Sequence, residues 1–144
     1  MTQSCILAAV DLVHKDSDTH VMEEAILLAR THGHDIEVVF VVPDQVYSYA
    51  QEYIPSDMRQ QVEVDAARDL AAYADSFDWQ GVGHSTKVLR GVVYEKLIER
   101  ADVLKAKFVV VGASKPSVKD LLIGPNAARV SRNASCSVLV VRPQ

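Results

Sequence analysis

Residues 109 to 130 read VVVGASKPSVKDLLIGPNAARV, and this stretch decides how the chain is interpreted. An apolar run ends on Gly112, a polar loop follows, and Gly124 directly precedes a helix-like pattern. Glycine lets the backbone come close to a ligand, and the free N–H groups and positive dipole end of a helix attract anions. The stretch therefore predicts a buried strand, a phosphate-type loop and a helix.

Short apolar runs alternate with longer segments of helical spacing along the whole chain, which is typical of a parallel α/β sheet. The apolar runs predict strands at 5–11, 35–44, 84–91, 107–112 and 136–143. The helical spacing predicts helices from Ser17 or Asp18 to Gly33, from Ser56 through Phe77, over 92–106 and over 125–133. Residues 84–91 alternate polar and apolar, which favours a half-exposed edge strand.

The longest predicted helix has apolar residues three or four apart, which defines one buried face. They are Met58, Val62, Ala66, Leu70, Tyr73 and Phe77. The segment before it, residues 45–55, carries three tyrosines and no clear period, so we predict a loop there.

Five strands joined by right-handed crossovers form a doubly wound, Rossmann-like α/β fold: a five-stranded parallel sheet with helices on both faces. With the strand order 3-2-1-4-5, the winding direction reverses between the first and fourth strands, and ligands bind at the carboxyl ends of the strands at such a point. Asp11 and the loop that begins at Gly112 would then face each other. The Asp11 carboxylate either hydrogen-bonds a ligand amine or hydroxyl or satisfies nearby backbone donors.

A chain of 144 residues is long enough to bury a core without disulfides or metals, so we expect one domain over residues 1–144. The net charge of −4 argues against a nucleic-acid partner. No apolar stretch approaches the roughly 20 residues that cross a bilayer, and the N-terminus lacks the features of a signal peptide. We therefore expect a cytoplasmic protein with no membrane span.

The two cysteines and the paired histidines do not suggest a metal site. Cys5 and Cys136 form no CxxC motif and lie in or beside apolar runs, which favours buried, reduced thiols. His32 and His34 flank Gly33, which is more typical of a solvated helix end than of a metal ligand pair.

The last predicted strand is apolar without alternation although it would lie at the edge of the sheet. Native proteins cover such edges because they invite pairing with other chains. We expect residues 137–142 to pair with their own copy across a two-fold axis, which gives a homodimer. Packing of these residues beneath the helices is the alternative.

Several segments together resemble the universal stress protein family, in the UspA-like form. They are ILAAVD (6–11), Gly91, FVVVGAS (108–114), LLIG (121–124) and CSVLVVRP (136–143). The resemblance covers the whole chain and implies a five-stranded α/β fold, a dimer through the last strand and binding of ATP or AMP, with Mg as a candidate companion of the phosphates. By position it assigns adenosine contacts to Asp11 and Val41, and ribose and phosphate contacts to the loop and the following helix start. The candidate binding residues are Ala9, Val10, Asp11, Val41, Gly112, Ala113, Ser114, Lys115, Gly124, Pro125, Asn126 and Ala127.

The loop departs from the family's nucleotide-binding pattern, G-x2-G-x9-G-[ST]. Here it reads G-x2-K-x8-G-P, so Lys115 replaces the middle glycine, one residue is missing and Pro125 replaces the hydroxyl residue. Ala9 and Val10 also replace the Pro-Thr pair that is common before the aspartate. Pro125 lacks an N–H and a hydroxyl, so we expect weakened phosphate binding, although Lys115 can supply charge.

Three functions follow as hypotheses. The first is a homodimer that binds an adenine nucleotide in a stress-response or regulatory role. The second is a dimer of the same fold that has lost its nucleotide and acts through protein contacts, with the tyrosine-bearing segment 46–54 as a surface. The third, a nucleotide hydrolase that relies on Asp11 and a phosphate-bound metal, is the weakest because the sequence offers no nucleophile beside a base and no carboxylate cluster for magnesium.

Overall fold

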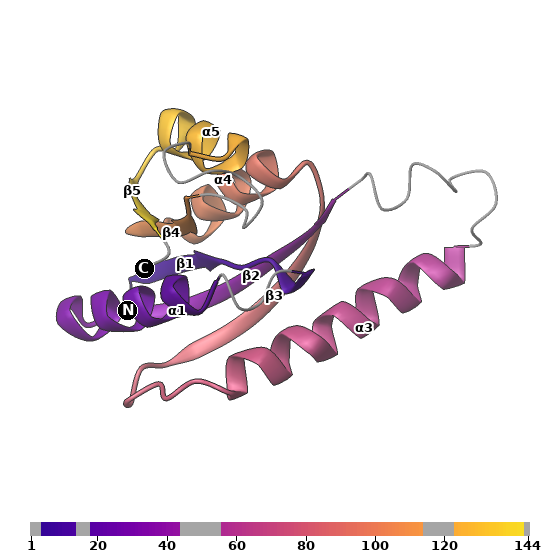
Figure 1. Cartoon of the computed structure of the whole chain (residues 1–144), viewed down its shortest axis with the longest axis horizontal. Helices are drawn as coiled ribbons and strands as arrows, with labels where there is room; N and C mark the ends of the chain where they lie inside the picture. Colours follow the sequence, from indigo (N-terminus) through magenta and orange to yellow (C-terminus); the bar gives the residue numbers. More distant parts are fainter. Residues whose placement is uncertain (1–3, 14–17, 44–55, 114–122, 143–144) are drawn as a thin grey trace.

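A five-stranded parallel sheet forms the centre of the molecule in a computed structural model that describes residues 4–13, 18–43, 56–113 and 123–142 (Figure 1). The strands are β1 (Cys5–Ala9), β2 (Asp35–Pro43), β3 (His84–Gly91), β4 (Phe108–Gly112) and β5 (Ser137–Val141). The helices are α1 (Thr19–His32), α3 (Ser56–Asp75), α4 (Val93–Leu104) and α5 (Pro125–Asn133). The strand order is β3-β2-β1-β4-β5, which confirms the predicted topology.

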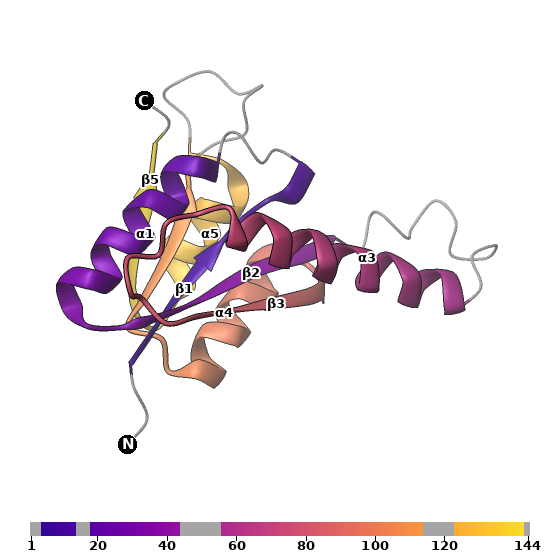
Figure 2. The same cartoon turned by 90° about the horizontal axis from the view of Figure 1, so that it is seen from below.

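Helices cover both faces of the sheet. Figure 1 shows α4 and α5 on one side and α1 and α3 on the other, and Figure 2 looks onto the α1 and α3 side. Successive side chains of a strand point to opposite faces of the sheet, so an apolar strand contributes side chains to two hydrophobic cores. The core beneath α1 and α3 includes Ile6, Ala8, Met22, Leu70 and Val110. The core beneath α4 and α5 includes Leu7, Val39, Leu97, Val109 and Val130.

The first helix has the predicted bounds. It begins after Asp18 and ends at Gly33, which has a φ of 73° and donates its N–H to the Ala29 carbonyl at 2.8 Å. This left-handed conformation is accessible to glycine without a steric penalty, so a glycine at this position ends the helix. Val21, Ala25 and Ala29 are buried on one face of this helix, and Leu28 is partly buried there.

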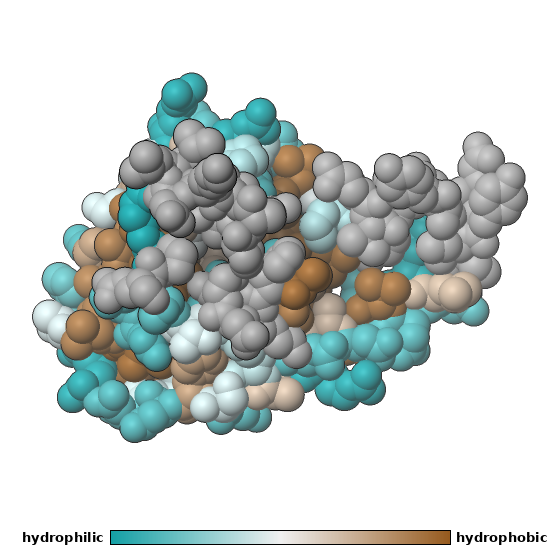
Figure 3. Space-filling view, viewed as in Figure 1, coloured by the Kyte–Doolittle hydropathy of each residue, from teal (hydrophilic) through white to brown (hydrophobic). Residues whose placement is uncertain are grey.

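The front half of α3 differs from the prediction. Met58 and Val62 were expected on the buried face, yet they are 56% and 37% exposed. The helix extends past the end of the sheet (Figure 1), and Figure 3 shows hydrophobic surface along this part of it. Leu70, farther along the same face, is fully buried. The period of the helix was predicted correctly, but β2 ends at Pro43 and leaves the first turns without a sheet beneath them.

The ends of several strands also differ from the prediction, most of all those of β1 and β5. The first strand ends at Ala9 instead of Asp11, although the Val10 N–H still donates to the Val39 carbonyl at 2.9 Å. The last strand spans 137–141 instead of 136–143. β3 is a half-exposed edge strand, as predicted. The predicted loop at 45–55 lies outside the described residues, and no helix within the described ranges is long and apolar enough to span a membrane.

Candidate functional site

The predicted switch point lies between β1 and β4, which are neighbours in the sheet. Ile6 pairs with Phe108 and Ala8 with Val110, so the two strands end at the same edge. The helix that follows β1 packs on one face, and the helix that follows β4 packs on the other. When the connections after two neighbouring strands run to opposite faces, a crevice forms at the carboxyl edge of the sheet. Ligands of doubly wound sheets bind in this crevice.

Asp11 lies two residues beyond β1 at this edge and is half-buried. One of its carboxylate oxygens, Oδ1, accepts the N–H of Val13 at 2.9 Å. This is the aspartate turn in which a side chain imitates a backbone acceptor. Of the two roles expected for the Asp11 carboxylate, this oxygen has the one in which it accepts a nearby backbone N–H.

Asp18 has a role at this edge that the sequence did not indicate. It is the N-cap residue of α1, as predicted, but within the described residues its side chain makes no capping hydrogen bond with that helix. Its Oδ2 accepts the backbone N–H of Asp11 instead, and the residue is only 8% exposed. Its Oδ1 lies 3.3 Å from the position that a Cβ atom on Gly112 would take. One buried carboxylate thus binds the turn after β1 and lies beside the end of β4.

A backbone hydrogen bond joins Gly124 to Ala113, the residue that follows Gly112. Gly112 ends β4 opposite Val141, and the next residue, Ala113, donates its N–H to the Val141 carbonyl at 2.8 Å. The Ala113 carbonyl accepts the N–H of Gly124. The chain therefore leaves the sheet and returns to α5 at one point. The N–H of Gly124, a candidate phosphate donor, is already used in this bond.

The start of α5 provides backbone donors without side-chain help. Gly124 is the N-cap residue and Pro125 occupies the first helical position, so that position has no N–H. Ala128 donates its N–H to the Gly124 carbonyl at 3.0 Å, which closes the first turn. The N–H groups of Asn126 and Ala127 precede that first bond and have no acceptor within the helix. These two N–H groups are what the helix start can offer an anion.

The remaining candidate residues on the strands belong mainly to the core. Val10 is buried beneath α1, and Val41 is buried on the opposite face beneath α4. Ala9 is half-buried and packs on the same cluster as Val41. These three residues therefore pack in the two cores, while Ser114 and Lys115 lie outside the described residues.

The chemistry at this edge suits binding. One carboxylate, that of Asp18, lies beside the glycine that ends β4 and also accepts the backbone N–H of Asp11. Within the described ranges, no three His, Cys, Asp or Glu side chains are grouped so that they could hold a metal ion. A divalent cation here would need oxygen ligands from a bound phosphate and from water, as Mg²⁺ commonly has in phosphate sites.

Comparison with known proteins places the chain in a family. A family model described as the universal stress protein family matches residues 5–142. The chain belongs to the universal stress protein family. Universal stress protein A homolog 1 of Coxiella burnetii is 29% identical over 139 residues, which cover 94% of each chain.

Two solved universal stress proteins share the fold and were determined with adenine nucleotides. One, solved in complex with cAMP, has a TM-score of 0.64 and 18% identity and covers 100% of both chains. The other, from Archaeoglobus fulgidus in complex with dAMP, has a TM-score of 0.66 and 18% identity, covering 97% of this chain and 98% of that one. The predicted family and fold are both confirmed.

Within this universal stress protein, Asp18 is the site residue that the sequence reading did not assign. A helix-capping interpretation accounted for an aspartate at that position, and nothing in the local pattern related it to Gly112. The available signal was the pair of aspartates seven positions apart across the turn after β1, since a short polar side chain at a turn often accepts a backbone N–H nearby.

Proposed function

We propose that this universal stress protein binds an adenine nucleotide, ATP or AMP, at the carboxyl edge between β1 and β4. One observation carries the proposal: the Asp18 carboxylate accepts the Asp11 N–H and also lies beside Gly112, so the turn after β1 and the end of β4 lie close together. The fold relatives solved with cAMP and dAMP support it. We further propose that residues 1–144 form one domain that acts as a cytoplasmic homodimer in a stress-response or regulatory role.

In this proposal the two halves of the ligand meet different parts of the edge. Asp11, with Ala9, Val10 and Val41 behind it, receives the adenosine. Ribose and phosphates meet the loop and helix start, listed in order as Gly112, Ala113, Ser114, Lys115, Gly124, Pro125, Asn126 and Ala127. Glycine at position 112 keeps the backbone accessible, and the Asn126 and Ala127 N–H groups supply donors.

Mass spectrometry of small molecules released from freshly purified protein tests the proposal most directly. It is expected to detect an adenine nucleotide, and added ATP or AMP is expected to raise the melting temperature. Asp11→Ala should remove that shift. Asp78→Ala is the matched control, because Asp78 also accepts a backbone N–H two residues ahead, from Gln80 at 3.1 Å, in a different turn. Absence of both copurified nucleotide and a shift at millimolar ligand contradicts the proposal.

The proposed dimer uses the free edge of β5. Within the part of the chain that the structure describes, this strand has one neighbour, β4, and Val138 through Val141 are only half-buried. In a parallel ladder the N–H and C=O of one residue point to the same neighbouring strand. Val141 accepts the Ala113 N–H and so faces β4, which leaves the N–H and C=O of Val140 directed to the open edge. A second copy of β5 would pair with these groups.

A second candidate function is a nucleotide-free dimer that acts through protein contacts. The use of the Gly124 N–H by Ala113, together with the missing N–H of Pro125, favours it. The tyrosine segment 46–54, a suggested contact surface, lies outside the described residues. Purified dimer without nucleotide and without a thermal shift, but with a binding partner lost on substitution of Tyr47, Tyr49 and Tyr53, would support this function.

A further inference from the structure

Tyr94 of α4 and Arg129 of α5 connect the two helices that cover one face of the sheet. The guanidinium carbon of Arg129 lies 4.8 Å from the centroid of the Tyr94 ring. This is a cation–π contact, in which the face of the ring attracts the positive charge. Tyr94 is half-buried and packs on the core that includes Val41 and Ala127, two of the candidate binding residues. The contact therefore belongs to the surroundings of the candidate site.

The contact with Tyr94 fixes the direction in which Arg129 points. α4 begins at Val93, directly after β3 ends at Gly91, so Tyr94 lies at the carboxyl edge of the sheet. Arg129 belongs to the second turn of α5, which begins at the same edge and lies beside α4 (Figure 1). Helical side chains tilt toward the N-terminus of their own helix, and the place of this guanidinium over Tyr94 agrees with that tilt. The charge of Arg129 is therefore carried toward the start of α5.

The positive charge of Arg129 is held in place without being neutralised. Among the residues that the structure describes, no carboxylate forms an ion pair with Arg129. Glu95, the acidic neighbour of Tyr94, accepts the hydroxyl of that ring at 3.3 Å instead. Asn126, whose N–H has no acceptor within the helix, lies three residues before Arg129 and so on the same side of α5. An anion at this helix start would meet both groups.

We propose that Arg129 contacts a phosphate group of the bound adenine nucleotide, and that Tyr94 is the positioning residue that holds the guanidinium there. This inference rests on the proposed nucleotide binding and adds a charged group to it. Arginine binds phosphate through parallel N–H···O bonds, which its planar guanidinium can form while it stacks on a ring. A side chain that is already held in place also loses less conformational entropy when the ligand binds.

Calorimetric titration with adenosine and with AMP tests this on the purified protein, because the two ligands differ by the phosphate group. Wild type is expected to bind AMP more tightly than adenosine. Arg129→Gln should weaken AMP about tenfold and change the affinity for adenosine by less than about twofold, since it removes a hydrogen bond to a charged group. Arg129→Lys keeps the charge but not the planar fork, so it should weaken AMP by only about threefold.

Arg132→Gln is the matched control for the change in net charge. Arg132 belongs to the same helix but lies in its last turn, away from the carboxyl edge, so this variant should bind AMP as wild type does. Variants of Tyr94 test the inference with the Arg129 charge in place, and so serve even if Arg129→Gln fails to fold. Tyr94→Leu removes the ring and should weaken AMP about threefold, whereas Tyr94→Phe keeps the ring and should bind as wild type does.

The outcomes separate this inference from the proposed function. AMP that binds Arg129→Gln as tightly as it binds wild type, or an equal loss for AMP and adenosine, overturns the phosphate contact while nucleotide binding stands. An equal loss in Arg132→Gln assigns the effect to net charge and also overturns it. Unchanged AMP binding in Tyr94→Leu overturns the positioning role of Tyr94. Wild type that binds neither adenosine nor AMP removes the proposed function and this inference with it.

Discussion

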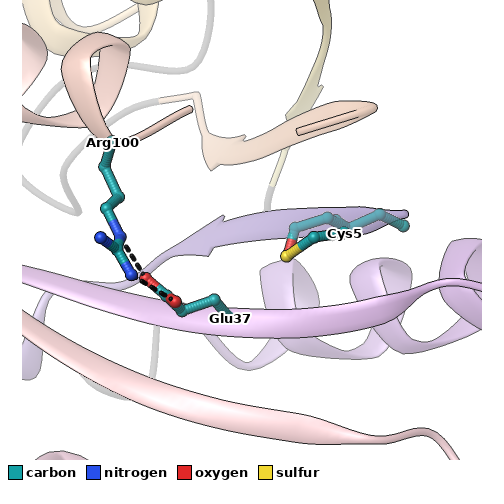
Figure 4. A network of polar contacts seen from close by, with 4 residues as sticks. Cys5, Glu37 and Arg100 are labelled. Carbon is teal, nitrogen blue, oxygen red and sulfur yellow. Dashed lines mark hydrogen bonds and ion pairs between the residues drawn. The ribbon is translucent and has the colours of Figure 1, made fainter. Parts of the chain in front are cut away.

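Arg100 of α4 donates two parallel hydrogen bonds to the carboxylate of Glu37 in β2. The Nε–Oε1 distance is 2.7 Å and the Nη2–Oε2 distance is 2.9 Å (Figure 4). The side chain of Glu37 is only 9% exposed and that of Arg100 is 23% exposed. The hydrogen bonds that Arg100 donates to Glu37 raise the pKa of Arg100 above its ordinary value. This bidentate ion pair links α4 to the sheet, and it needs both side chains.

Arg100→Met is expected to lower the free energy of unfolding by about 3 kcal/mol, because it leaves the buried Glu37 charge without its partner. The double variant Glu37→Leu with Arg100→Met should recover most of that loss, since no buried charge remains. Arg68→Met, which breaks the exposed Arg68–Asp65 pair, is the control and should change stability by less than about 1 kcal/mol. Urea unfolding measures all of them, and equal costs for Arg100→Met and Arg68→Met would contradict the assigned role.

Pro125→Ser is expected to tighten ATP binding about tenfold. The change restores one backbone N–H at the start of α5 and adds a hydroxyl, and a hydrogen bond to a charged group is worth about 1.5–3 kcal/mol. Titration with ATP measures the gain. Pro125→Ala supplies the N–H without the hydroxyl and divides the two contributions. Unchanged affinity in both variants would mean that phosphates do not reach this helix start.

Val140→Pro is expected to convert the proposed dimer to monomer without unfolding the sheet. The Val140 N–H points away from β4, so its loss removes no bond between β4 and β5, and proline is tolerated on sheet edges. Light scattering after size exclusion gives the mass of the species in solution.

Leu139→Pro is the counterpart of that variant. Leu139 faces β4 in the alternating ladder, so its loss of an N–H should destabilise the chain itself, which thermal unfolding measures. A Val140→Pro protein that keeps the mass of a dimer would show that β5 does not form the interface.

Ionisation of the two thiols is expected to lower the free energy of unfolding as pH rises above about 8.5. Burial raises the pKa of Cys5, with the Glu37 charge adding to it, and burial and the Asp102 charge raise the pKa of Cys136. A raised folded-state pKa stabilises the fold fully below the unfolded-state pKa, and this contribution is lost as pH rises through the folded-state pKa. A double Cys→Ala variant should therefore show a shallower fall in unfolding free energy between pH 8 and 10.

Alkylation by iodoacetamide distinguishes the two sites. Cys136 lines an open pocket of about 440 Å³ with Lys105 and Lys107, whereas Cys5 lies in β1 between β2 and β4. Cys136 is expected to react first, and both thiols should react more slowly than in the urea-unfolded chain. Faster reaction of Cys5 would contradict this order.

Most helix bounds could be predicted because they depend on local patterns, and the strand order could be predicted because the alternation of strands and helices indicates a doubly wound sheet. α5 begins at Pro125 and ends at Asn133, as predicted, since proline at a first turn and a polar end are both local signals. α1 ends at Gly33 for a similar reason. The exposure of Met58 could not be predicted, because it depends on where β2 stops beneath the helix.

The internal contacts of the candidate site could not be predicted from the sequence. Asp18 and Gly112 are far apart in the chain, and their contact depends on which way one carboxylate turns. A helix-cap pattern admits either orientation. The use of the Gly124 N–H by Ala113 likewise depends on how the two ends of the loop meet, which the spacing of glycines does not encode.

The hydrogen bond between Gly124 and Ala113 fixes the two ends of the intervening segment, so its length can change independently of the rest of the fold. Its two attachment points are one backbone hydrogen bond apart, so a segment of another length fits between them while β4 and α5 stay in place. Closure entropy changes only slowly with the number of residues enclosed. A deletion of one residue in this segment is therefore compatible with the same sheet and helices, and a segment of different sequence could be introduced between Ala113 and Gly124.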